Sequence, residues 1–103
     1  MRKKVKIFVI GSNYDLINDF KEKMNKNGYQ VVSYKDIKLY KFEKYNEEEK
    51  ILRKTLFGIT TCDGVTSVED TVLTSKIIKV CNILGIPYLS VHNWIAYLNN
   101  RSK

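Results

Sequence analysis

The sequence contains few residues of the types that interrupt regular structure or carry metal and redox chemistry. Its 103 residues include one proline, five glycines, two cysteines and one histidine. So little glycine and proline argues against a disordered linker. Cys62, Cys81 and a single histidine are too few ligands for a metal site, and no cofactor is expected. Both cysteines stand among apolar residues, so we interpret them as small buried side chains rather than as a disulfide.

Long apolar runs are also missing. The longest are strand-sized, far below the roughly 20 residues that cross a bilayer. The apolar run of residues 7–10 follows a basic start, but it is too short for the core of a signal peptide. We therefore expect a cytoplasmic protein without a membrane segment, folded as one domain over residues 1–103.

The charge balance is strongly basic, with a formal net charge of +7. Lysines concentrate at residues 2–6 and 35–44. This balance suits an acidic partner, such as a nucleotide phosphate, a nucleic acid or an acidic protein. The alternative interpretation is an ordinary solvated basic surface.

The hydrophobic pattern predicts strands that alternate with amphipathic helices. Strands are expected over residues 5–10, 29–33, 64–68 and 86–91. Helices are expected between residues 13 and 28, over 46–60, from the neighbourhood of Glu69 and Asp70 up to Gly85, and over 92–100. This order predicts the α/β class, as a three-layer α-β-α sandwich with right-handed crossovers. The expected sheet has four parallel strands in the flavodoxin-like, or Rossmann-like, order 2-1-3-4.

Several residues mark where these helices begin, end and face the core. Asn46 is a predicted N-cap with Glu49 completing a capping box, and Asn27–Gly28 and Gly85 are predicted helix ends. The residues predicted to face inward are Leu16, Ile17, Phe20 and Met24 in the first helix, Leu73, Ile77, Val80, Cys81 and Leu84 in the third, and Trp94, Ile95 and Leu98 in the fourth.

The candidate binding site follows from the topology, because open parallel sheets bind ligands beyond the carboxyl ends of their strands. The residues expected there are Gly11, Ser12, Asn13 and Tyr14, then Ser67, Glu69, Asp70 and Thr71, then Ser90 and His92. Helix N-termini at these points offer free amides to an anion. Each residue also has a structural alternative, since Gly11 suits a tight turn and Asn13 suits a helix cap.

Residues 34–45 interleave lysines with aromatic residues, and we interpret them as a loop with a helical turn. Lys35, Lys38 and Lys41 are candidate contacts for phosphates or nucleic acid, and Tyr34 and Tyr40 are candidates for stacking on a base. The alternative is that these aromatic residues pack against the core or a sheet edge. The sequence has no Gly-x-Gly-x-x-Gly, no P-loop and no Gly-x-Ser-x-Gly motif.

The segments Cys62-Asp63-Gly64-Val65 and Leu84-Gly85-Ile86-Pro87-Tyr88-Leu89, with the opening 6–11, resemble the nucleoside 2-deoxyribosyltransferase-like superfamily, including its small uncharacterised, often phage-borne members. That resemblance implies a nucleoside-sized crevice and a nucleophilic glutamate ten residues before the proline. The aligned position here is Ile77, which cannot attack an anomeric carbon. Glu69 and Asp70 are the only candidates to replace it.

Among the possible functions, the sequence favours a non-catalytic nucleotide- or nucleoside-binding protein. The alternatives are a protein–protein interaction module, a divergent nucleoside deoxyribosyltransferase or N-glycoside hydrolase, and a basic nucleic-acid-binding protein. Dimers are common in the resembled family, and Trp94, Tyr97 and Leu98 are the expected contacts of a homodimer.

Overall fold

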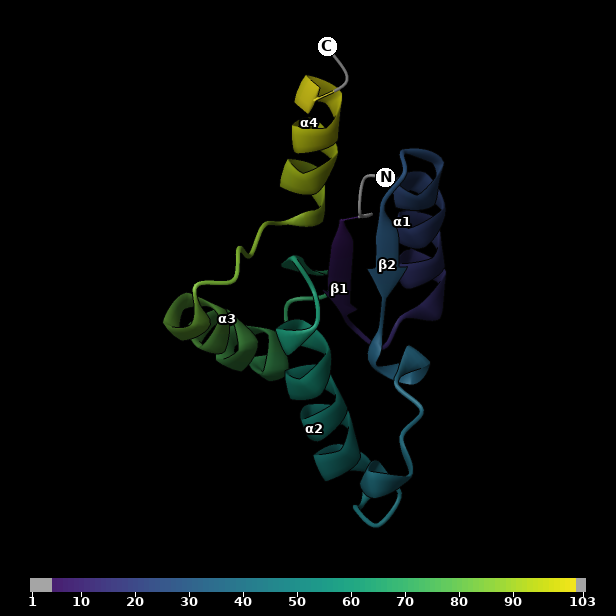
Figure 1. Cartoon of the computed structure of the whole chain (residues 1–103), viewed down its shortest axis with the longest axis vertical. Helices are drawn as coiled ribbons and strands as arrows, with labels where there is room; N and C mark the ends of the chain where they lie inside the picture. The colour runs from purple at the N-terminus through teal and green to yellow at the C-terminus, as the bar shows by residue number, and fades with distance from the viewer. Residues whose placement is uncertain (1–4, 102–103) are drawn as a thin grey trace.

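A three-stranded parallel sheet lies at the centre of the fold (Figure 1). The computed structural model describes residues 5–101, and the side chains of residues 5–97. The strands are β1 (Lys6–Ile10), β2 (Gln30–Val32) and β3 (Gly64–Ser67), in the order β2-β1-β3. The central strand β1 is covered on both faces, which explains why its sequence is an almost continuous apolar run. The α/β class is thus confirmed.

The predicted fourth strand, and with it the order 2-1-3-4, is wrong. Beside β3 the segment 86–91 makes a single parallel bridge, between Val65 and Tyr88. Pro87 has no N–H, so the pairing cannot extend toward the start of β3. At the other end Ser90 already accepts the first helical hydrogen bond, from the backbone nitrogen of Trp94 at 3.0 Å. The segment is therefore too short to extend the sheet.

Two hydrophobic clusters hold helices against the two faces of the sheet. On one face α1 (Tyr14–Lys26) and α4 (Val91–Arg101) contribute to a cluster that includes Ile17, Phe20 and Trp94. On the other face α2 (Glu47–Thr60) and α3 (Val72–Leu84) contribute Ile59, Ile77 and Cys81. The indole nitrogen of Trp94 donates to the carbonyl of Val65 at 3.2 Å, which fixes α4 on β3.

The predicted helix ends are largely confirmed. The Oδ1 atom of Asn46 accepts a hydrogen bond from the backbone nitrogen of Glu49 at 2.8 Å, and Asn27 ends α1. Gly85 ends α3 in the left-handed conformation that glycine adopts most easily. The predicted capping box of α2 is not completed, because the carboxylate of Glu49 pairs with Arg53 at 3.0 Å instead.

Some residues predicted to face inward are exposed. Leu16 is 45% exposed and Leu84 is 52% exposed, while the rest of the predicted α3 stripe packs against the sheet. Trp94 is 5% exposed and therefore lies inside the fold rather than on a dimer surface. The side chain of Leu98 lies outside the described residues, as do Lys3 and Lys4 of the basic start.

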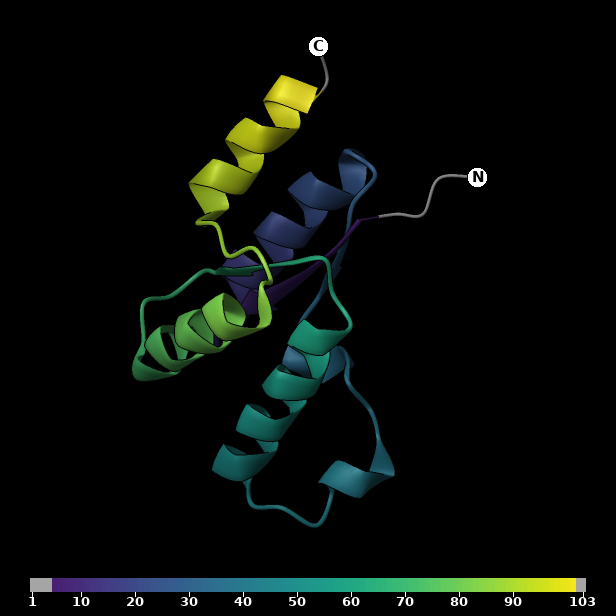
Figure 2. The same cartoon turned by 60° about the vertical axis from the view of Figure 1, so that its left-hand side comes forward.

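The molecule is elongated, with extents of 46 × 27 × 26 Å, because α2 extends beyond the carboxyl edge of the sheet and α4 extends beyond the opposite edge (Figures 1 and 2). The segment between β2 and α2 runs along α2 and contains two short 3-10 helices, η1 (Tyr34–Asp36) and η2 (Tyr40–Phe42). The predicted loop with a helical turn therefore contains two such turns.

Candidate functional site

A cavity of about 190 Å³ lies at the carboxyl edge of the sheet, where the strand order reverses between β1 and β3. We call it the sheet-edge cavity. Its lining consists of Val9, Ile10, Gly11, Ser12, Tyr34, Ile51, Thr55, Glu69, Thr71 and Leu73. The topological rule thus located four residues on this cavity, Gly11, Ser12, Glu69 and Thr71. Tyr34, predicted separately in the segment 34–45, lines it as well.

The carboxylate of Glu69 accepts hydrogen bonds from the backbone amides that were expected to bind an anion. Its Oε1 atom accepts hydrogen bonds from the backbone nitrogens of Ser12 at 3.1 Å and Asn13 at 2.6 Å. Its Oε2 atom accepts the hydroxyl of Ser12 at 3.3 Å. Glu69 therefore joins the loop after β3 to the loop after β1 and supplies the negative charge that this turn favours.

The free backbone amides in the first turn of α1 are also hydrogen-bonded within the protein. The side chain of Asn13 accepts hydrogen bonds from the backbone nitrogens of Asp15 at 3.1 Å and Leu16 at 3.3 Å. Asn13 is thus a helix cap, the structural alternative considered above. Together with Glu69 it leaves this turn poorly suited to a phosphate, because the donors are used and a carboxylate already stands beside them.

A network of hydroxyl groups holds the backbone that carries Glu69. The Ser67 hydroxyl and the Thr74 hydroxyl both donate to the backbone carbonyl of Glu69, the latter at 2.8 Å. The Thr71 hydroxyl accepts a hydrogen bond from the backbone nitrogen of Thr74 at 3.2 Å and thereby caps α3. Asp70 does not line the sheet-edge cavity but a second hollow of about 360 Å³, together with Ser67 and Tyr88. Glu69 lines both spaces, so the two predicted acids meet only in this second hollow.

Tyr14 and Tyr34 form a phenol pair at the rim of the cavity. Their hydroxyl oxygens lie 3.1 Å apart, and the Lys35 ammonium stands 3.9 Å from the centre of the Tyr14 ring. The hydrogen bond with Tyr14, followed by burial, raises the pKa of Tyr34 to about 12. Hydrogen bonding to Lys35, followed by that to Tyr34, lowers the pKa of Tyr14. Tyr34 therefore presents a neutral hydroxyl to the cavity at physiological pH.

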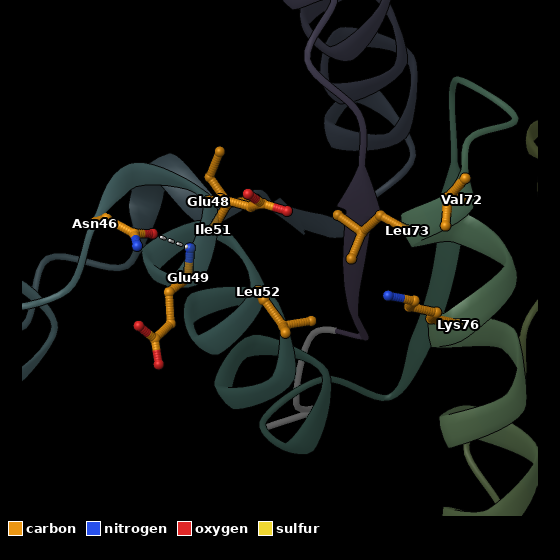
Figure 3. Close-up of a pocket in the computed structure, with 8 residues that line it drawn as sticks. All are labelled: Asn46, Glu48, Glu49, Ile51, Leu52, Val72, Leu73 and Lys76. Carbon is orange, nitrogen blue, oxygen red and sulfur yellow. Dashed lines mark hydrogen bonds between the residues drawn. The ribbon is translucent and has the colours of Figure 1, made fainter.

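A second, larger cavity of about 420 Å³ opens between the first turns of α2 and α3 (Figure 3). We call it the α2–α3 groove. Its lining consists of Asn46, Glu48, Glu49, Ile51, Leu52, Val72, Leu73 and Lys76. Ile51 and Leu73 line both cavities, so the groove adjoins the sheet-edge cavity.

The remaining predicted site residues lie elsewhere. The Ser90 hydroxyl accepts a hydrogen bond from the backbone nitrogen of Asn93 at 3.1 Å at the start of α4, and His92 is exposed in the first turn of that helix. Lys38 and Tyr40 are exposed, Tyr40 to 95%. Lys41 lies 4.8 Å from the centre of the Phe57 ring. The segment 34–45 therefore contributes only Tyr34 to the cavity and does not close over it.

Charges of both signs lie where this segment meets α2. Lys50 pairs with Glu43 at 3.3 Å and with Glu47 at 3.4 Å, and Arg53 pairs with Glu49. A phosphate backbone would meet this mixture of both signs rather than a basic stripe, so the structure adds no support to a nucleic-acid interface here.

Ile77 and the two cysteines are core residues. Ile77 is fully buried against the sheet, at 0% exposed, and lines none of the cavities described above. Burial raises the pKa of Cys62 to about 11 and also raises the pKa of Cys81. Both thiols are therefore protonated at neutral pH and poor nucleophiles. Within residues 5–101, no group of three or more potential metal ligands comes together.

Sequence reasoning missed Thr55, Glu48 and Lys76. Thr55 interrupts the apolar face of α2 at the spacing of Ile51 and Ile59, and a polar residue on an apolar helix face was an available signal. Glu48 and Lys76 gave no signal, because their proximity depends on how α2 and α3 cross.

Comparison of the chain with protein-family models, with curated proteins and with solved structures finds no match. Among the described residues, no helix is both long and apolar enough to span a membrane. The two cavities are therefore the candidate sites of function.

Proposed function

We propose that this protein binds a neutral nucleoside, without modifying it, with the sugar in the sheet-edge cavity. The observation that carries this proposal is the position of Glu69, whose carboxylate both lines the cavity and occupies the amides of Ser12 and Asn13. A bound phosphate would have to displace that carboxylate or lie against its charge. A sugar hydroxyl can instead donate to it.

The hydrogen-bonding capacity that remains suits a sugar. The Oε2 atom of Glu69 accepts one long bond, from the Ser12 hydroxyl at 3.3 Å, and retains a lone pair for a ligand hydroxyl. Tyr34 and Thr71 line the same cavity. Their hydroxyls pair with Tyr14 and Thr74, and each keeps hydrogen-bonding capacity for a ligand. Val9, Ile10 and Leu73 supply the apolar surface that a sugar ring and its base require.

The proposal assigns the protein no covalent chemistry. The resembled transferases would place their nucleophile where this chain has Ile77, which is buried in the core. Glu69 is held by three hydrogen bonds, and Asp70 does not line the sheet-edge cavity. That cavity is therefore lined by one carboxylate, whereas most glycoside hydrolysis uses a pair of them.

The test is equilibrium ultrafiltration of the purified protein with nucleosides and their 5′-monophosphates, read by mass spectrometry. Intact nucleosides should be retained, and each should bind at least about tenfold more tightly than its monophosphate, a difference of about 1.4 kcal/mol. Free base or free sugar among the products would show an enzyme, and tighter binding of the monophosphates would contradict the proposal.

A further inference from the structure

The α2–α3 groove adjoins the cavity that is proposed to hold the sugar, so it is the candidate site for the base of the nucleoside. This inference rests on the proposed function. Pockets for small molecules usually measure about 300–1,000 Å³. The sheet-edge cavity alone, at about 190 Å³, falls below that range, whereas the adjoining groove adds about 420 Å³. A ligand held at Glu69 that exceeds the sheet-edge cavity would therefore reach the groove past Ile51 and Leu73, which line both spaces.

Two side chains of opposite charge enter the groove from opposite helices. Figure 3 shows the Glu48 carboxylate reaching in from α2 and the Lys76 ammonium reaching in from α3. Neither makes an ion pair in the part of the chain that the structure describes. The acid of the next residue is already engaged, because Glu49 pairs with Arg53. The groove thus offers one free cationic donor and one free anionic acceptor.

Between these charges the surface is apolar. Leu52 and Leu73 point into the space that separates the two helices (Figure 3). A flat ring with apolar faces and a polar edge fits such a surface, and a nucleobase has this form. Its edge must then present an acceptor to Lys76 and donors to Glu48.

We propose that the α2–α3 groove is a base subsite selective for guanine. The edge of guanine carries the O6 acceptor beside the N1–H and N2–H donors. A carboxylate accepts both donors through its two oxygens, and lysine is a common partner of O6. Adenine has no O6 and no N1–H, and hypoxanthine lacks the amino group, so each loses part of this pattern. A site with charged partners for a base edge discriminates strongly when one partner is missing.

The test is the affinity of guanosine, inosine and adenosine for the wild-type protein and for Glu48→Gln and Lys76→Met. Both side chains are exposed, so neither substitution removes a core contact. Lys79→Met, an exposed lysine of the same helix that lines none of the cavities described, and Glu47→Gln are the matched controls. Wild type should prefer guanosine to adenosine by about tenfold or more, with inosine between them.

In the Glu48→Gln and Lys76→Met proteins this preference should fall to within about threefold, while the controls keep it. Nucleoside binding with no base preference, or with a preference that survives both groove variants, would overturn the guanine subsite and leave the proposed function intact. Failure of the wild-type protein to bind any nucleoside would overturn both.

Discussion

The Oε1 atom of Glu69 lies 2.6 Å from the backbone nitrogen of Asn13, although 56 residues separate them in the chain. This contact puts a carboxylate at the turn after β1, where many α/β proteins bind phosphate. The protein thereby carries its own anion at the edge of its candidate site. The proposed preference for neutral ligands, and several expected properties of the surrounding fold, depend on contacts of this kind.

Gly58 lets α2 approach the ring of Phe8, and we expect Gly58→Ala to destabilise the fold. A methyl group at this position would lie 2.2 Å from Cε2 of Phe8, a fully buried ring that cannot move aside. Overpacking costs about 1–3 kcal/mol, which outweighs the helix-propensity gain of about 1 kcal/mol. Urea unfolding measures the change, and Phe8→Leu in the same chain should recover part of it. Unchanged or greater stability of Gly58→Ala would show that α2 and β1 are less closely packed.

Thr66 in β3 is the site of an expected stabilisation. Its hydroxyl is buried and has no hydrogen-bond partner among the residues described. Thr66→Val keeps the branched shape that strands favour and removes the unpaired group, so the free energy of unfolding should rise by about 1 kcal/mol. Thr55→Val, also at a buried threonine, is the control and should give no such gain. A loss of stability in Thr66→Val would mean that the hydroxyl is hydrogen-bonded after all.

Asp36 connects α1 to the segment after β2 and should make stability depend on pH. It accepts hydrogen bonds from the Lys21 ammonium at 2.9 Å and from the backbone nitrogen of Ser33 at 2.8 Å. Partial burial alone would raise the pKa of Asp36, but these bonds outweigh it and hold the pKa below its ordinary value of 3.8. The stabilising contribution is therefore complete above that value and is lost as the pH falls through the folded-state pKa.

Asp36→Asn should consequently be less stable than wild type at pH 7, and the difference should shrink below about pH 4. Urea unfolding at pH 7, 5 and 3 gives the comparison. Asp19→Asn, which breaks an exposed pair with Lys23, is the control and should have little effect at any pH. A difference that stayed constant down to pH 3 would exclude an ionised Asp36 as its cause.

The sequence predicted correctly those features, such as helix caps, that depend on residues close together in the chain. Asn46 begins its helix, and Asn27 and Gly85 end theirs, as expected, because capping depends on a few adjacent residues. The prediction of a fourth strand was wrong because the pairing of residues 86–91 with β3 depends on residues far away in the chain. Pro87 removes a donor on one side of Tyr88, and α4, fixed by Trp94 on Val65, begins on the other.

For the candidate site, too, some features could be predicted from the sequence and others depended on the tertiary structure. The loops that carry Ser12 and Glu69 were located by the topological rule, which needs only the strand order near β1 and β3. That Glu69 would take the amides of Ser12 and Asn13, and that Glu48 and Lys76 would share a groove, depends on tertiary distances. Lys35 and Tyr14 likewise meet only because η1 returns to α1, which no periodicity in residues 34–45 indicates.

The most direct test of the central claim compares nucleoside and 5′-monophosphate affinities by calorimetry for wild type, Glu69→Gln and the neighbouring control Asp70→Asn. Wild type and Asp70→Asn should favour the nucleoside by about tenfold or more. Glu69→Gln, which keeps an acceptor for the two amides but loses the charge, should bind the nucleoside more weakly and the monophosphate more tightly. If wild type bound neither ligand, or if Glu69→Gln kept the wild-type preference, the carboxylate would not be the selecting group and the account would be contradicted.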